Sequence, residues 1–227
     1  MQQRQIISSL EDLHSYVASL EPSMSTIFRG ITDSNEHQLI PSIGRRRFGP
    51  LGDQPLHINE RRMFRLFKEA ALPYLTLFIP TKDWEWLALA QHHGLPTRLL
   101  DWSANPLVAA YFAVEKEHSG DSAIYMYSGT DTVDPETISN PFCINKVLRY
   151  RPPHISPHIV AQRGLFTVHP DPTKPFKSQQ LVKLVIKKQA RRKMKKLLYK
   201  YGISRETLFP SLEGLTTDLD WLHCDTY

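Results

Sequence analysis

The sequence predicts an α+β fold, in which helices pack on the outside of a mixed and bent β-sheet. The first observation behind this prediction is a set of short β-forming runs, at residues 26–30, 97–102, 123–127 and 181–186. The second is that segments with helical periodicity lie between these runs. The third is size, because 227 residues of which 41% are hydrophobic suffice for one large domain with a sizeable core.

The N-terminal segment is predicted to be a small appendage of this domain. Within residues 1–22 we expect an amphipathic helix packed on the domain edge, since Ser9 is placed to cap it through Asp12 and apolar residues recur at helical spacing at Ile6, Leu10, Leu13, Val17 and Leu20. Residues 23–227 are then predicted to form one domain, which includes a basic helix at about 188–201.

The sequence excludes several classes of protein. It has no secretory leader pattern and no apolar run of membrane-spanning length, so we expect a cytoplasmic protein without a membrane partner. Its two cysteines, Cys143 and Cys224, lie far apart and lack the spacing of a zinc site or a disulfide framework. We therefore expect no metal cofactor.

Positive charge is concentrated in one segment. Between Asp171 and Glu206 there are twelve of the 28 lysines and arginines and no acidic residue, while the remaining 16 basic residues are outnumbered by 23 acidic ones. The predicted basic helix has an apolar stripe for docking, so we expect its charged side chains to face outward. The candidates for binding nucleic acid, phosphate or an acidic partner are Arg191, Arg192, Lys195 and Lys196.

Residues 87–114 hold the densest group of chemically committed side chains. A helix from Asp83 is predicted to end at Gly94, the β run 97–102 follows, and a second helix begins after a cap at Ser103 or Asn105. The polar residues around this β run suggest a lined pocket, with candidates Gln91, His92, Arg98, Asp101 and Ser103. The alternative stays open that these side chains only form hydrogen bonds within the protein and stabilise the bend of the chain between helix and strand.

Two further candidates come from other parts of the chain. The β run 26–30 ends in Arg29 and Gly30, where backbone freedom at the glycine would let Arg29 reach an anion or a carboxylate bidentately. Residues 159–168 are predicted to be a bent strand, or two short strands, with Gln162 beside the bend. An amide there is either a backbone tie or a contact to substrate.

The sequence resembles FRG domain proteins over about residues 20–215. The positions that carry the resemblance are Phe28-Arg29-Gly30, Glu60, the block QHHGLPTRLLDW at 91–102, Asn105-Pro106, Phe112-Ala113, Ala161-Gln162 and Phe209-Pro210. The long block makes the resemblance specific. The family does not by itself define a reaction, although it implies a bacterial or phage defence or toxin context.

The β run that ends in Arg-Gly is followed by a strand with Ser or Thr leading into a helix of the A-x-x-F-A type, and then by a late strand pair. This order resembles, more distantly, that of NAD-using ADP-ribosyltransferases, which implies an ADP-ribosyltransferase-like core and NAD as the nucleotide. An arginine, an imidazole, a carboxylate and aromatic planes are expected to converge here, so we expect a nucleotide-dependent transferase or glycohydrolase with Arg29, His92, Asp101 and Gln162 as catalytic positions. In it Arg29 is the anion clamp, His92 the proton donor or ribose ligand, and Gln162 a positioning amide. Arg29 would bind the pyrophosphate of the cofactor, with Ser103 in a supporting position. Trp102 or Phe166 would stack on nicotinamide. The remaining cofactor-binding candidates are Gln91 and Arg98.

Gln162 departs from that pattern, because the transferases carry a glutamate in the late strand. A neutral amide can bond a ribose hydroxyl but cannot stabilise positive charge. Either Asp101 or Glu60 substitutes for it, or the domain binds a nucleotide without cleaving it. The alternative function is a non-catalytic module that binds nucleic acid or a protein partner through the basic helix.

Overall fold

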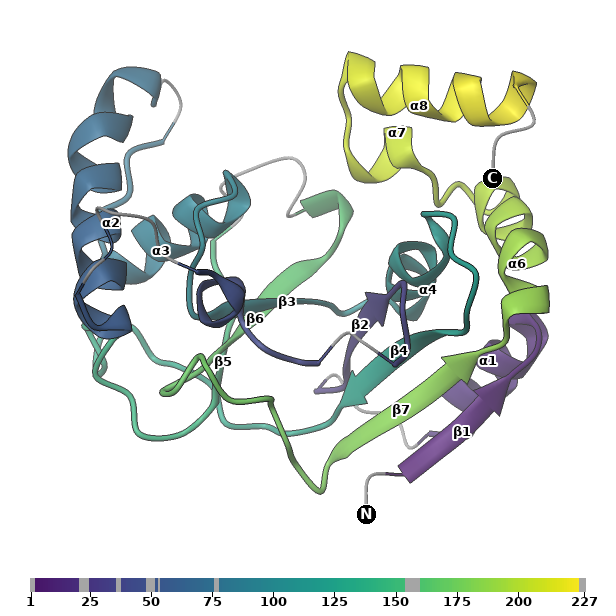
Figure 1. The fold of residues 1–227 in the computed structure, drawn as a ribbon, viewed down its shortest axis with the longest axis horizontal. Coiled ribbons are helices and arrows are strands. Elements are labelled where there is room, and N and C mark those ends of the chain that lie inside the picture. The colour runs from purple at the N-terminus through teal and green to yellow at the C-terminus, as the bar shows by residue number, and fades with distance from the viewer. Residues whose placement is uncertain are drawn as a thin grey trace.

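The computed structural model describes residues 3–20, 25–35, 38–47, 52, 54–75, 78–153 and 160–224. Its described strands form one sheet in the order β1-β7-β4-β2-β3-β6-β5 (Figure 1). The strands are β1 (Gln3–Ile7), β2 (Ile27–Ile31), β3 (Leu99–Ser103), β4 (Ser122–Tyr127), β5 (Leu148–Tyr150), β6 (Gly164–Val168) and β7 (Leu181–Ile186). Because β1 runs parallel to β7 and the other neighbours are antiparallel, the predicted mixed sheet is confirmed.

Helices cover the sheet from outside, as the sequence predicts (Figure 1). They are α1 (Leu10–Ala18), α2 (Leu56–Ala71), α3 (Asp83–His92), α4 (Pro106–Val114), α6 (Lys188–Lys200), α7 (Arg205–Leu208) and α8 (Leu212–His223), with 3-10 turns at Ser42–Arg45 and Leu72–Tyr74. None of the helices in the described residues is long and apolar enough to cross a membrane.

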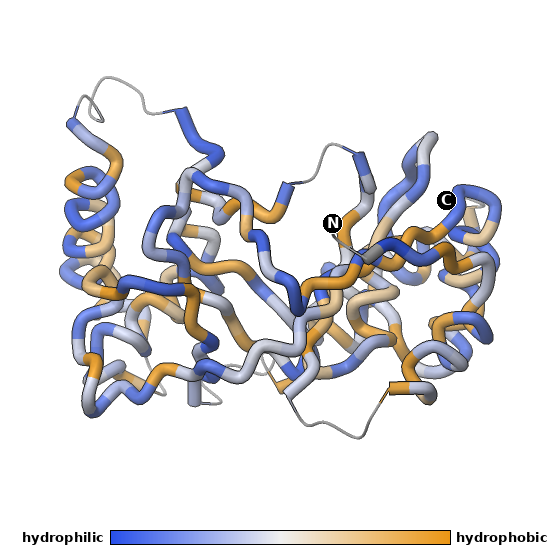
Figure 2. Tube along the Cα trace, turned by 90° about the horizontal axis from the view of Figure 1, so that it is seen from below, coloured by the Kyte–Doolittle hydropathy of each residue, from blue (hydrophilic) through white to orange (hydrophobic). Residues whose placement is uncertain are grey.

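The sheet separates the core into layers. Along β4 the side chains alternate, so that Ile124 and Met126 pack with α1, α4 and α6, while Tyr125 and Tyr127 pack on the opposite face. A third cluster joins α2 and α3 to β5 and β6. Figure 2 shows hydrophobic and hydrophilic residues alternating along the helical turns.

Helix α4 and its start behave as their sequence indicates. Asn105 is the N-cap, since its Oδ1 accepts a hydrogen bond from the Leu107 backbone N–H at 2.9 Å, and Pro106 occupies the first turn. The helix is buried on most of its surface, which fits its nearly uniform apolar sequence. It lies directly on β2 and forms one wall of the site described below.

The N-terminal segment differs from its prediction. Residues 3–7 form a strand, in which Ile6 lies opposite Val185 of β7, and the helix begins only at Leu10. Ser9 does cap that helix, because its Oγ accepts from the Asp12 N–H at 3.1 Å. The apolar spacing around Ile6 suited a helix, but a free strand position beside β7 offers a full backbone ladder instead.

The region around Gln162 also differs. The expected strand through residues 159–168 begins only at Gly164, residue 159 lies outside the described residues, and a turn at Gln162 and Arg163 precedes the strand. Arg163 has a φ of 45°, the left-handed conformation that such a tight entry requires. Gln162 is therefore a turn residue at the edge of the sheet.

Candidate functional site at the split in the sheet

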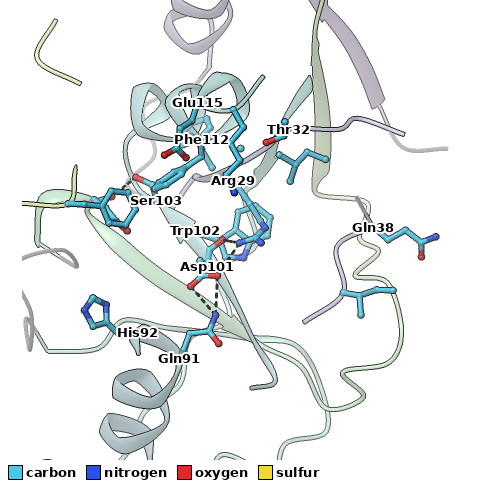
Figure 3. Close-up of a pocket in the computed structure, with 18 of the residues that line it drawn as sticks. Arg29, Thr32, Gln38, Gln91, His92, Asp101, Trp102, Ser103, Phe112 and Glu115 are labelled. Atoms are coloured by element: carbon cyan, nitrogen blue, oxygen red, sulfur yellow. Dashed lines mark hydrogen bonds and ion pairs between the residues drawn. The ribbon is translucent and has the colours of Figure 1, made fainter. Parts of the chain in front are cut away.

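The sheet opens between β2 and β3. These strands share one register pair, Phe28 opposite Ser103, whereas β2 pairs with β4 and β3 with β6 over five positions each. Beyond the shared pair the two strands diverge. A cleft of about 620 Å³ lies at this opening, a volume within the range of small-molecule sites (Figure 3).

Arg29 bridges the opening from β2. Its Nη1 donates to the backbone carbonyl oxygen of Asp101 at 2.6 Å and to the Asp101 carboxylate at 3.3 Å. Within the described part of the chain, its Nε and Nη2 donate to no other group. Arg29 thus has a fixed position and N–H groups left for a ligand.

The carboxylate of Asp101 is oriented by a series of hydrogen-bonded side chains that begins with Gln91 of α3. The amide Nε2 of Gln91 is 3.0 Å from both carboxylate oxygens, and the Gln91 Oε1 accepts from the Thr97 hydroxyl at 2.6 Å (Figure 3). The Thr97 backbone N–H in turn donates to Ser42 Oγ at 3.1 Å. Asp101 nevertheless keeps 57% of its side chain exposed, so its carboxylate is both held and accessible.

The cleft has a second arginine. Arg45, at the end of the 3-10 turn, lines the cleft, and it forms no hydrogen bond or ion pair with the described residues. Burial, followed by the nearby charges of Arg29 and Arg46, lowers the pKa of Arg45, while Asp101 acts in the opposite direction. Two guanidinium groups that repel each other across a cleft favour an anion between them.

Most of the predicted site residues lie in this one cleft. It is lined by Arg29, Gln91, His92, Asp101, Trp102, Ser103 and Gln162, which come from β2, α3, β3 and the turn before β6. The half-buried His92 ring packs edge-to-face on His93 at a centroid distance of 5.0 Å. Residues distant in sequence therefore share one site, as the hypothesis of a lined pocket requires.

Ser103 and Gln162 join the cleft to the C-terminal segment. The Ser103 hydroxyl donates to the Gln162 backbone carbonyl at 2.7 Å, and the Gln162 side-chain amide donates to the Leu208 carbonyl at 3.1 Å. The amide thus serves as a backbone tie, which is one of its two expected uses. It holds the end of α7, next to Phe209, against the cleft.

The two aromatic residues expected to stack on a ligand are buried instead. Trp102 is 3% exposed, and its indole N–H donates to the Thr167 hydroxyl at 2.9 Å. Phe166 is 5% exposed, packs in the cluster of α2 and α3, and is not among the described residues that line the cleft. The half-buried aromatic residues that line the cleft are Phe112 and Phe209, in edge contact at 5.9 Å.

Arg98 and Glu60 form a buried ion pair outside the cleft, which corrects their expected roles. The Arg98 Nε and Nη2 donate to the Glu60 carboxylate, the shortest distance being 2.6 Å, and both side chains are 5% exposed or less. Glu60 therefore cannot supply a carboxylate to the cleft, and Arg98 cannot contact a ligand there. The pair fixes α2 to the start of β3.

Glu115 is a cleft residue that the sequence interpretation missed. It follows the last residue of α4 and lines the cleft with 15% of its side chain exposed, on the opposite side of Arg29 from Asp101 in Figure 3. A carboxylate is unfavourable at a helix C-terminus, and an ion pair with Arg205 compensates it. The first charged residue after a long apolar helix was the available signal.

The basic helix is confirmed as α6, but two of its four candidate residues face inward. Arg191 is 1% exposed and donates to the carbonyls of Lys116, His118 and Gly120, the His118 contact being 2.9 Å. Lys195 is 8% exposed and donates to the Glu115 carbonyl at 2.9 Å, and burial lowers the pKa of Lys195 to about 8. These two cations dock α6 onto the chain that follows α4.

No group of three or more metal-ligating side chains occurs among the residues that the structure describes. The two exposed cysteines, Cys143 and Cys224, are free thiols.

His169, directly after β6, is a buried histidine whose titration is expected to make the stability of the fold depend on pH. It is 2% exposed, shares a 2.9 Å hydrogen bond with Thr167, and its pKa is lowered to about 3 by burial and by the charges of Arg29 and Arg98. The folded protein thus keeps His169 neutral at pH values where the unfolded chain, with a pKa of 6.5, takes up a proton. Stability is retained above pH 6.5 and lost as the pH falls below it.

We expect the His169 contribution to unfolding free energy to fall by about 2 kcal/mol between pH 7 and pH 5. Urea titrations of the parent and of His169→Gln at both pH values measure it, because other titrating groups contribute equally to the two proteins. The variant should lose less stability over this interval. An equal loss in both would show that His169 does not carry this pH dependence.

The fold and the cleft together define an α+β domain with a ligand-sized site at the centre of its sheet. Residues 24–122 match the family model of the FRG domain, so the chain carries an FRG domain over this range. No curated protein and no solved structure matches the chain. The matched range contains Arg29, Gln91 and Asp101, and it ends before Gln162 and α6.

Proposed function

We propose that the cleft between β2 and β3 binds NAD and that the chain cleaves its nicotinamide–ribose bond, passing the ADP-ribose to water or to an acceptor. The observation that carries this proposal is the Arg29–Asp101–Gln91 network, which places a partly free guanidinium and an oriented, accessible carboxylate in one cleft. The distant resemblance to ADP-ribosyltransferases supplies the reaction class.

The anion-binding part of the proposal rests on Arg29 and Arg45. Arg29 keeps Nε and Nη2 for a ligand. The pKa of Arg45 is lowered first by burial and then by the nearby positive charges, and a bound negative group would offset both effects. A pyrophosphate offers two such groups, and the planar fork of arginine suits phosphate oxygens. The pyrophosphate would therefore lie at the Arg29–Arg45 side of the cleft.

The stacking part of the proposal moves from Trp102 and Phe166 to Phe112 and Phe209. These two rings line the cleft and are half-buried, so each offers an apolar surface to a flat ring. Phe209 is held at the cleft by the Gln162–Leu208 hydrogen bond and by Arg205, whose guanidinium carbon lies 3.9 Å from the ring centroid. Nicotinamide or adenine would be bound at this wall.

The chemical part of the proposal rests on Asp101. When the bond from ribose to nicotinamide breaks, its electron pair leaves with nicotinamide and positive charge develops on the ribose. A preorganised carboxylate stabilises that charge, which a glutamine amide at 162 cannot do. Both cleft carboxylates are paired with an arginine, but Asp101 is the better candidate because 57% of its side chain is exposed, against 15% for Glu115. His92, on the same rim, would contact a ribose hydroxyl.

Nicotinamide release from NAD tests the reaction. We expect the purified chain to release nicotinamide, with or without a protein acceptor, and Asp101→Asn to reduce the rate by about a hundredfold, a loss typical of removing one electrostatic contact in the transition state. Glu115→Gln is the matched control and should retain most of the rate. Equal losses in the two variants would contradict the assignment of Asp101, and no release under any condition would contradict the reaction.

A binding-only function is the second candidate, and Gln162 favours it. Its amide is committed to the Leu208 carbonyl, so the position where the transferases carry a glutamate has a structural use here. A chain that binds NAD tightly, with Arg29 required, but releases no nicotinamide would have this function.

A further inference from the structure

The exposed side of α6 forms a groove with α8. Two hollows of about 540 and 460 Å³ adjoin on this side of α6 and share the three cations Arg192, Lys196 and Lys200. The larger hollow is lined by α6 alone and the smaller one by α6 and α8. Their other lining residues are Gln189, Lys193, Leu197, Tyr199, Trp221, Leu222 and His223, so none of the described residues that line this α6–α8 groove is acidic. The groove is therefore a cationic hollow whose lysines and arginine all belong to the segment 172–205, which holds twelve lysines and arginines and no acidic residue.

The three shared cations form a line along the helix. They are spaced four residues apart, which corresponds to about 6 Å of helix rise for each step. This spacing is close to that of consecutive phosphates along an extended nucleic-acid strand. All three residues are exposed, and α6 is held rigidly by the inward-facing Arg191 and Lys195.

Lys193, on the other edge of the groove, lies near α1. The pKa of Glu11 there is lowered first by a backbone hydrogen bond and by the Ser9 side chain, and the charge of Lys193 adds to this effect. The three aligned cations line both hollows, whereas Lys193 lines only one of them, so we assign the principal phosphate contacts to that line.

An aromatic pair lies beside the line of cations. Tyr199 and Trp221 are in edge contact at a centroid distance of 5.6 Å, and Tyr199 is 37% exposed. The Lys195 ammonium lies 4.8 Å from the centroid of the Trp221 ring. Cations that follow a backbone, next to aromatic rings that can stack on bases, are the combination that binds single strands. An acidic peptide would use the cations but would not need the rings.

We propose that the α6–α8 groove binds single-stranded nucleic acid, with phosphates along Arg192, Lys196 and Lys200 and a base against Tyr199 and Trp221. The inference is independent of the chemistry in the cleft. The binding face of α6 therefore differs from the expected one. Arg191 and Lys195 are buried and take no part in it, whereas Tyr199 and Trp221 form one edge of the proposed site.

Fluorescence anisotropy with a labelled oligothymidylate of about 12 nucleotides, measured over a series of salt concentrations, tests the charge line. The parent should bind with a steep salt dependence. In the Lys196→Gln/Lys200→Gln variant, affinity should fall and the slope of log affinity against log salt should decrease by about 1.4, since each single-strand phosphate contact contributes about 0.7. The Lys174→Gln/Lys177→Gln variant removes two exposed lysines at the other end of β7 and should match the parent.

The aromatic edge is tested separately. Tyr199→Leu/Trp221→Leu should weaken binding about tenfold without changing the salt slope, because stacking involves no counterion release. Thermal melting shows that each variant is folded, and Tyr199→Leu alone serves if the double variant is not. The proposal is overturned if the oligonucleotide does not bind at low salt, or if the lysine pair leaves the slope unchanged. It is also overturned if polyglutamate of equal charge competes as well as the oligonucleotide and the aromatic variants bind normally.

Discussion

The Gly30→Ala variant is expected to lose more than about 4 kcal/mol of unfolding free energy, a loss in the range of the most severe point substitutions. A β-carbon at this position would lie 1.9 Å from the carbonyl oxygen of Ala109 and 2.6 Å from the backbone nitrogen of Ala113. Both atoms belong to the backbone of α4, so no side-chain rotation relieves the clash. Helix α4 would have to move away from β2, and its packing on the sheet would be lost.

Gly94→Ala is the matched control for this prediction. Gly94 has a φ of +84° and open space around it, so alanine there costs only the strain of a left-handed conformation, about 1–2 kcal/mol. Denaturant titrations of the two variants compare a steric effect with a conformational one. If Gly30→Ala were no less stable than Gly94→Ala, the close contact between α4 and β2 would not be needed for the fold.

The Arg29→Ala variant is expected to bind NAD about a hundredfold more weakly than the parent, equivalent to about 2.7 kcal/mol. Arg29 would contribute charge-assisted bonds to the pyrophosphate in the same position from which it now bonds Asp101. Arg29→Lys keeps the positive charge but lacks the planar guanidinium that can bond two phosphate oxygens at once. We therefore expect its affinity for NAD to lie between those of Arg29→Ala and the parent. Isothermal titration calorimetry with NAD and with ADP-ribose provides the measurement.

The matched control is Arg46→Ala, which removes an exposed arginine next to the cleft that does not line it. It should bind NAD as the parent does. Equal weakening in Arg29→Ala and Arg46→Ala would mean that the general positive field of the region attracts the nucleotide, and it would remove Arg29 from its assigned role. ADP-ribose should depend on Arg29 as NAD does, because both contain the pyrophosphate.

The sequence was most informative where local chemistry dictates local structure. Gly94 ends α3 in a left-handed conformation, and Asn105 with Pro106 begins α4, so the elements around residues 91–106 could be predicted correctly. From the sequence, Gly30 is expected to give the backbone beside Arg29 conformational freedom. Its φ is not in the left-handed region, and its use is the close approach of α4, which depends on a contact about 80 residues away in sequence.

The failures have a common cause, which is non-local packing. Residues 3–7 became a strand because of a partner at 182–186, and the ion pair of Arg98 with Glu60 crosses from β3 to α2. For the basic helix a local signal did exist. Arg191, Met194, Lys195 and Leu198 lie at spacings of three, four and seven residues on one stripe, which indicates that both cations face the core. This stripe is missed when the basic residues of the helix are grouped by charge without regard to their spacing.

A crystal structure of the chain soaked with NAD or ADP-ribose tests the central claim most directly, because it locates the nucleotide itself. The account predicts that the pyrophosphate lies within hydrogen-bond distance of Arg29 in the cleft between β2 and β3. It also predicts that a flat ring of the nucleotide lies against Phe112 or Phe209 and that the ribose faces Asp101. A nucleotide bound elsewhere on the domain, or an empty cleft at saturating nucleotide, would contradict it.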